Sequence, residues 1–271
     1  MSATGLQKSG LYVCPKCHHP LLSVDDSLIC RACNRTYPIA GGIPDFLQEE
    51  ILVRQDPSYR NIKKMEFLAP IYEGWVWHSF ILRVLAGADS SSLQGIAQFV
   101  AETLKGVTGS VLDVACGPAT YGRRMATAAR TVYGIDFSMG TLRQGMVHIR
   151  RDGNADVFLS RARIPELPFG NGVFDGAICC GSLHLFPDTV AALREIARTM
   201  KAGAPLAVTT FAGENAGILQ WINRRRQIRI FRLPDLQQMM MEAGFEPFQP
   251  VLDGSFLMFR TRKAAPATGA I

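Results

Sequence analysis

Short apolar runs alternate with amphipathic, helix-like stretches from residue 109 to near the end of the chain. The short runs are rich in Val, Ile and Leu, as buried strands are. An alternation of this kind is typical of a parallel sheet with helices on both faces. We expect strands at 111–114, 132–136, 156–159, 174–179 and 206–211, and helices at 93–104, 121–129, 141–150, 190–200 and 236–243.

The regular pattern ends in a hairpin. Two further strands are expected at 245–251 and 255–262, joined through the turn-forming pair Asp253-Gly254. Parallel strands followed by a terminal antiparallel hairpin predict an α/β fold with a doubly wound, seven-stranded, Rossmann-like sheet.

The N-terminal segment carries two Cys-x-x-Cys pairs, Cys14 with Cys17 and Cys30 with Cys33. Four thiolates that converge from two such turns form a tetrahedron, which suits structural zinc and leaves no open position for catalysis. Between the pairs, residues 21–22 and 28–29 predict a short hairpin with its turn at 25–27. A unit this small cannot build a sufficient core, so a metal would contribute most of its stability.

Disulfides and a redox Cys-x-x-Cys are the alternatives for these cysteines, and His18 and His19 are alternative ligands. Residues 1–10 lack the apolar stretch of a secretory signal, and no apolar run is long enough to span a membrane. We therefore expect reduced cysteines in a cytoplasmic protein. Cys116, Cys179 and Cys180 are expected to be small buried hydrophobic residues rather than nucleophiles.

Composition and charge narrow the class further. With 271 residues, of which 48% are hydrophobic, the chain has room for one large domain and a small appendage. The net charge of +6 includes a cluster at Arg224, Arg225, Arg226, Arg229 and Arg232. Such a cluster is usually a solvated face, and the alternative is a contact with an anionic partner.

We expect four segments along the chain. They are a zinc ribbon at 1–47, a helical linker and lid at 48–95, a cofactor-binding domain at 96–263 and a flexible tail at 264–271. The second segment is strongly aromatic, with Tyr72, Trp75, Trp77 and Phe80. These side chains would line an apolar pocket or belong to an ordinary core.

The loop after the first strand of the predicted sheet is rich in small residues: Asp113-Val-Ala-Cys-Gly117-Pro-Ala119-Thr-Tyr-Gly122. Small residues let a ligand approach the backbone closely, and the helix that follows offers free N–H groups. Asp136 ends the next strand, where an acid can accept both hydroxyls of a ribose. Loop and acid together indicate a nucleoside cofactor.

These stretches resemble the class I S-adenosylmethionine (SAM) methyltransferases, in particular the branch of ubiquinone/menaquinone-biosynthesis methyltransferases. The N-terminal segment is similar to the zinc ribbon of small methyltransferase-activator proteins, through residues 14–21 and 30–44. An NAD dehydrogenase fits less well, because the G-x-G-x-x-G loop is replaced by Ala-Cys-Gly-Pro-Ala-Thr. The stretches that carry the methyltransferase resemblance are 111–122, 133–139, 167–169, 174–175, 183–184, 195–198 and 243–245.

The resemblance implies SAM as the cofactor and a role for each matching residue. Asp113, Ala115 and Gly117 would hold its methionine end, and Asp136 its ribose. The adenine would lie between Phe137, Ser138 and Met139 on one side and Ala162 and Arg163 at its edge. Cys180 and Gly181 would border the sulfonium and the substrate.

Two residues depart from the family's pattern. Ala119 stands where the family has a Gly, which adds a methyl group near the cofactor. Arg163 stands where an acid often accepts a hydrogen bond from the adenine, and a guanidinium cannot accept one.

We therefore expect a SAM-dependent methyltransferase that transfers a methyl group by in-line displacement to a small, aromatic or lipid-like acceptor. His184 is the candidate base or hydrogen-bond partner of that acceptor, and a structural histidine is the alternative. Two other functions are alternatives. One is an RNA (guanine) methyltransferase. The other is a non-methylating SAM-fold cyclase or binding protein, which the departures at Ala119 and Arg163 support. The oligomeric state has no signal in the sequence.

Overall fold

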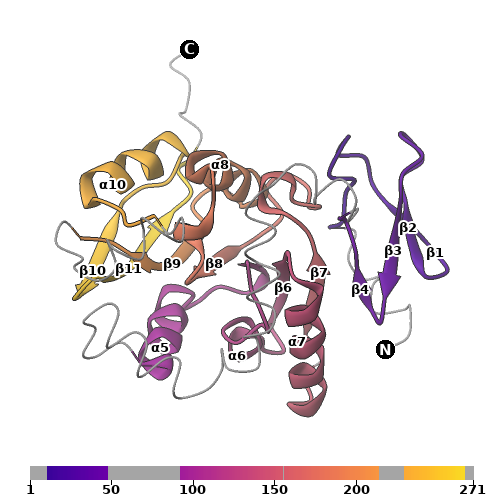
Figure 1. Cartoon of the computed structure of the whole chain (residues 1–271), viewed down its shortest axis with the longest axis horizontal. Helices are drawn as coiled ribbons and strands as arrows, with labels where there is room; N and C mark the ends of the chain where they lie inside the picture. The colour runs from indigo at the N-terminus through magenta and orange to yellow at the C-terminus, as the bar shows by residue number, and fades with distance from the viewer. Residues whose placement is uncertain (1–10, 48–91, 155, 214–228, 266–271) are drawn as a thin grey trace.

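The computed structural model describes residues 11–47, 92–154, 156–213 and 229–265. Most of the predicted linker and lid, with its aromatic cluster, lies outside these residues, as do Arg224, Arg225 and Arg226. The described chain forms a four-stranded sheet near the N-terminus and a seven-stranded sheet flanked by helices (Figure 1).

The large sheet has the strand order β10-β11-β9-β8-β5-β6-β7. Neighbouring strands from β9 to β7 are parallel, and β11 pairs antiparallel with both β9 and β10. The prediction of a doubly wound, seven-stranded sheet with a terminal hairpin is confirmed. The strands are β5 (Gly109–Val114), β6 (Arg130–Asp136), β7 (Val157–Arg161), β8 (Gly176–Cys180), β9 (Pro205–Phe211), β10 (Gln249–Asp253) and β11 (Phe256–Arg262).

Helices cover both faces of this sheet. On one face lie α5 (Leu93–Thr103), α6 (Gly122–Met125) and α7 (Met139–Arg151), and on the other α8 (Thr189–Thr199) and α10 (Leu233–Glu242) (Figure 1). The strands supply both cores by alternation: Val111 and Val132 belong to the core under α5 and α7, whereas Leu112 and Tyr133 belong to the core under α8 and α10.

The predicted helix at 121–129 is wrong at its C-terminal end, because α6 stops at Met125 and Ala126 is extended. The side chain of Arg130 caps this end and joins it to the end of α5. The guanidinium of Arg130 donates to the carbonyl oxygens of Met125 at 3.2 Å and of Leu104 at 2.9 Å. These bonds satisfy carbonyls that the ends of α5 and α6 leave open.

The predicted strand at 245–251 is wrong at its start. Phe245 forms only an isolated bridge with Lys263, and the ladder with β11 begins at Gln249. Pro247, between them, has no N–H to donate to a ladder.

The N-terminal unit, residues 11–47, is built on the order β1-β2-β3-β4. Its strands are β1 (Leu22–Val24), β2 (Ser27–Ile29), β3 (Thr36–Ala40) and β4 (Ile43–Pro44). The predicted hairpin is confirmed, with its turn at Asp25 and Asp26, while Ser27 already belongs to β2.

This unit packs against the free edge of β7 and the segment that follows it. Tyr12 stacks on Phe169 with ring centroids 5.3 Å apart, and its hydroxyl lies 2.6 Å from Ser160 Oγ in β7. The N–H of Phe46 donates to the carbonyl of Arg161 at 2.9 Å. The two units therefore share one core, which continues from Tyr37 and Phe46 into the sheet.

Among the helices that the structure describes, none has both the length and the apolar character to cross a membrane.

Candidate functional site

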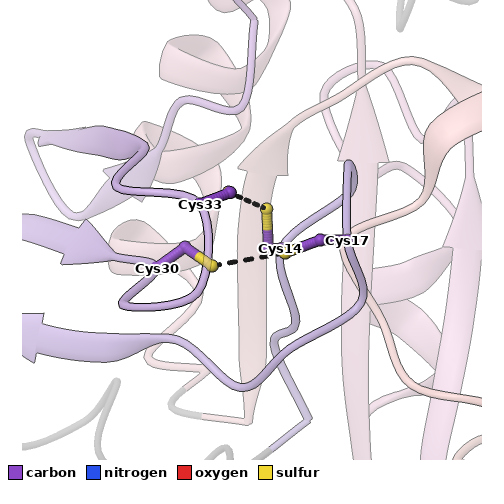
Figure 2. Close-up of side chains that lie close together, drawn as sticks. All are labelled: Cys14, Cys17, Cys30 and Cys33. Carbon is purple, nitrogen blue, oxygen red and sulfur yellow. Dashed lines mark hydrogen bonds between the residues drawn. The ribbon is translucent and has the colours of Figure 1, made fainter.

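The four N-terminal cysteines form one cluster (Figure 2). Their sulfurs all lie within 4.8 Å of one another, and no disulfide joins them. Two contacts join the turns: the sulfurs of Cys14 and Cys33 lie 3.6 Å apart, and those of Cys17 and Cys30 lie 3.4 Å apart. Tetrahedral zinc, with bonds of about 2.3 Å, holds its sulfurs about 3.8 Å apart, so this donor set fits zinc.

The two cysteine turns have matching backbones. The residue after the second cysteine of each pair, His18 or Asn34, takes a left-handed φ of 56°. The N–H of Cys14 donates to the carbonyl of His19, and the N–H of Cys30 donates to that of Arg35. Neither His18 nor His19 belongs to the metal-ligating cluster found in the described residues.

A second group of predicted residues gathers at the C-terminal ends of the parallel strands. Asp136, at the end of β6, accepts the N–H of Gly117 on Oδ2 and the N–H of Ser138 on Oδ1, both at 2.8 Å. Its carboxylate thus joins the loop after β5 to the loop after β6. Ser138 also caps α7, because its Oγ accepts the N–H of Thr141 at 3.1 Å.

The loop after β5 is tightly wound. Ala115, Gly117 and Ala119 all have left-handed φ values, of 52°, 54° and 58°. A Cβ added to Gly117 would meet no atom within 4 Å, so open space lies beside it. The side chain of Ala119 is 1% exposed and belongs to the core under α7. Its methyl group therefore points into the protein.

Asp113 lies beneath this loop and is 3% exposed. Its Oδ2 accepts the N–H of Gly122 at 3.1 Å, and a Cβ on Gly122 would lie 2.5 Å from the same oxygen. Burial raises the pKa of Asp113 to about 8, against the opposing effect of this hydrogen bond. Asp113 is therefore mostly protonated at pH 7.

The ends of β7 and β8 complete the group. Ala162 is buried, and its N–H donates to the carbonyl of Asp136 at 3.0 Å. Arg163 pairs with Glu166 at 2.6 Å. Cys180 ends β8, where burial raises its thiol pKa well above the usual value. Gly181 has a φ of 76° with open space beside it, as Gly117 has.

His184 follows the end of β8 in the short 3-10 helix η4 (Leu183–Leu185). It is 7% exposed and packs edge-on to Phe211, with ring centroids 4.8 Å apart. Its Nδ1 lies 3.4 Å from Thr210 Oγ1. Burial lowers the pKa of His184 to about 4, so the ring is neutral at pH 7.

Comparisons with known proteins agree with this geometry. A family described as "Methyltransferase domain" matches residues 111–203, and one described as "Trm112p-like protein" matches residues 13–42. The first match covers the strands that carry Asp113, Asp136 and Cys180, and the second covers the cysteine cluster. The chain carries a class I SAM-dependent methyltransferase domain. The N-terminal unit that precedes it is a Trm112-like domain.

Two relatives and one solved structure illustrate the similarity. An uncharacterised chloroplastic methyltransferase of Arabidopsis thaliana is 26% identical over 95% of this chain and 79% of its own length. Demethylmenaquinone methyltransferase of Corynebacterium kroppenstedtii is 35% identical, over 38% of this chain and 42% of its own length. Phosphoethanolamine N-methyltransferase 2 of Haemonchus contortus, solved with S-adenosylhomocysteine, has a TM-score of 0.62 over 76% of this chain and 59% of its own. At 15% identity, it shows the shared fold of the methyltransferase domain.

Sequence reasoning missed two charged residues beside the group, Asp45 and Arg161. Arg161 ends β7 next to the predicted Ala162, and its side chain joins Asp45 of the Trm112-like domain to the loop at Phe137. An arginine at the end of an otherwise apolar strand was the available signal. Nothing in the sequence indicated its partner, which is far away along the chain.

The left-handed loop gives a prediction for stability. We expect Ala115→Gly to raise the free energy of unfolding by about 0.5 kcal/mol, because a left-handed residue other than Gly costs about 1–2 kcal/mol and Gly regains part of that as chain entropy. The matched control is Ala191→Gly, at a half-buried position in α8, which should lower stability by about 1 kcal/mol. Urea unfolding measures both, and equal losses would contradict the strained loop.

The burial of Asp113 gives a prediction for pH. The folded chain keeps a proton that the unfolded chain releases between pH 3.8 and about 8. The free energy of unfolding should therefore fall as pH rises through this range, by at most about 1.4 kcal/mol per unit, and level off above it.

Asp113→Asn keeps an acceptor for the N–H of Gly122 and removes the titration. Urea unfolding at a series of pH values should show that the variant lacks the part of the slope assigned to Asp113, because all other groups are shared. Parallel curves for wild type and variant would mean that Asp113 is ionised in the folded protein.

Proposed function

We propose that the chain transfers a methyl group from SAM to a small, aromatic or lipid-like acceptor, bound at the C-terminal ends of β5, β6 and β8. The carboxylate of Asp136 carries this proposal. It is held by two backbone N–H groups, one from each loop, and it stands where the methyltransferase resemblance puts the ribose. Its Oδ2 keeps a lone pair for one ribose hydroxyl. Its Oδ1 also lies 3.4 Å from Thr141 Oγ1, and it can accept the second ribose hydroxyl because the Thr141 hydroxyl can donate instead to the carbonyl oxygen of Ser138 at 3.0 Å.

Asp113 would meet the methionine end of the cofactor. SAM supplies an electrophilic methyl group on a cationic sulfonium, and its amino group is a second cation. A cation near Asp113 favours the carboxylate over the neutral acid and would lower its raised pKa. The open space beside Gly117 would receive the remaining part of the methionine moiety, next to the backbone of residues 115–117.

The two departures from the family's pattern are compatible with this arrangement. The methyl group of Ala119 is buried in the core, so it takes no room from a cofactor beside Gly117. The guanidinium of Arg163 is occupied by Glu166, and it would cover the adenine as a flat surface rather than accept a hydrogen bond from it. Phe137 and Met139 would pack on the other side, beside Ser138.

His184 would act on the acceptor as a neutral hydrogen-bond partner. A ring whose pKa is about 4 holds a proton poorly at pH 7, which makes it a weak general base. The adjoining Phe211 and Leu185 give this region an apolar wall. That wall and the demethylmenaquinone relative favour a quinol-like acceptor as the first one to test.

The cysteine cluster would hold one structural zinc ion. All four ligand positions would be thiolates, which leaves no place for substrate or water on the metal. Cys14 and Cys30 are fully buried, and the cluster adjoins the core shared with the methyltransferase domain. The metal would therefore stabilise the docking of both units.

Binding of S-adenosylhomocysteine tests the cofactor site. Calorimetry on the 271-residue chain should show binding that Asp136→Ala weakens about 100-fold, the equivalent of two hydrogen bonds to a charged group. Asp26→Ala, which removes an exposed acid from the β1–β2 turn, should bind like the wild type.

Mass spectrometry of acceptors incubated with protein and SAM then tests the reaction. A methylated quinol-like product supports the proposal. A methylated RNA product with strongly salt-dependent binding would replace the small acceptor by RNA. Tight cofactor binding with no methylated product from any acceptor would point to a non-methylating protein.

Metal analysis tests the zinc site. The purified chain should contain one zinc ion, and Cys30→Ser should lose it together with several kcal/mol of stability, on the order of a structural zinc site. Cys116→Ser, which changes a thiol outside the cluster, should keep its zinc. A zinc-free wild type with the same unfolding midpoint in the presence of a chelator would contradict the proposal.

A further inference from the structure

One buried ion pair crosses from the Trm112-like domain to the cofactor side of the methyltransferase domain. Arg161, the last residue of β7, is 5% exposed. Its Nη1 donates to Asp45 Oδ2 at 3.0 Å, and its Nε donates to the carbonyl oxygen of Phe137 at 3.0 Å. One guanidinium thus touches both units.

Backbone hydrogen bonding holds Asp45 next to Arg161. Residues 45 and 161 form a parallel bridge, and the N–H of Phe46 donates to the carbonyl of Arg161 at 2.9 Å. The other carboxylate oxygen of Asp45 accepts the N–H of Leu47 at 2.9 Å. Because the two side chains are only 15% and 6% exposed, loss of one charge would leave the other buried with a weaker partner.

The contact with Phe137 reaches the centre of the cofactor loop. Phe137 stands between Asp136, which holds the loop after β5, and Ser138, which caps α7. The Phe137 carbonyl belongs to the peptide unit between Phe137 and Ser138. A hydrogen bond to this carbonyl therefore fixes the backbone that positions both the Asp136 carboxylate and the start of α7. The charge on the donor makes this bond stronger than a neutral one.

We infer that Asp45 and Arg161 are positioning residues through which the Trm112-like domain sets the affinity of the cofactor site. The docked domain places Asp45, Asp45 orients Arg161, and Arg161 holds the loop at 136–138. Because coupling between two sites is reciprocal, a bound cofactor also strengthens the docking of the Trm112-like domain. This inference rests on the proposed cofactor site.

A matched pair of variants separates this coupling from docking in general. Asp45→Asn keeps the shape of the side chain and weakens its hold on Arg161. Tyr12→Phe removes the hydrogen bond between the Trm112-like domain and Ser160, the residue before Arg161, and keeps the ring against Phe169. Consecutive strand residues face opposite sides, so Tyr12→Phe loosens the docking without touching the loop at Phe137.

In calorimetry with S-adenosylhomocysteine, Asp45→Asn should weaken binding about tenfold, within the usual range of coupling between sites. Tyr12→Phe should change binding less than about twofold, since it touches no group of the coupling path. Arg161→Lys serves as a second variant. A single ammonium cannot reproduce the two fixed N–H directions, so it should also weaken binding while both charges are kept.

Hydrogen exchange of the cofactor-free protein gives a readout that does not depend on cofactor binding. In Asp45→Asn the amides of Ser138 and Thr141, which donate within the loop and cap, should exchange about tenfold faster, and in Tyr12→Phe they should not. Equal effects of both variants, or no effect of either, would overturn the inference. A wild type that binds no S-adenosylhomocysteine would instead overturn the proposed function, and the exchange data would still decide the coupling.

Discussion

An edge strand presents unpaired N–H and C=O groups to its surroundings, and a sheet is safe from unwanted pairing only where that edge is covered. One of the two edges of the seven-stranded sheet is β7, and the Trm112-like domain lies against it. The bridge between residues 45 and 161 and the hydrogen bond from Phe46 satisfy backbone groups at the end of the strand. The rings of Tyr12, Phe46 and Phe169 pack together and bury the adjoining surface.

The end of β7 contacts both the Trm112-like domain and the loop that carries Asp136. Ser160 meets Tyr12, Arg161 meets Asp45 and the loop at Phe137, and the N–H of Ala162 bonds to Asp136. Residues with such different partners follow one another directly because successive strand residues face opposite sides. Because both units lie on one chain, the Trm112-like domain is present in a one-to-one ratio with the methyltransferase domain and at a high effective concentration near β7.

The elements that follow from local pattern were predictable, and those that depend on distant partners were not. The strand at Val111 and the Cys-x-x-Cys pairs carry their own signals in spacing and hydrophobicity. At the early end of α6, the guanidinium of Arg130 binds the carbonyl oxygen of Met125 together with that of the distant Leu104. The residues predicted to hold the cofactor lie near one another because strand ends gather at one edge of a parallel sheet. Arg161 was missed because its role depends on a partner from the other unit.

The docking of Tyr12 against Ser160 joins residues 148 positions apart, and this has a consequence for synthesis. The ribosome adds about 5–20 residues per second, so the Trm112-like domain, which ends at Leu47, is complete roughly 6–23 s before the end of β7, the strand that will bury its aromatic face. During that interval Tyr12 and Phe46 are exposed on a nascent chain. A filled metal site would help the emerging domain keep its shape until β7 arrives, so the order of events on the ribosome favours zinc loading before docking.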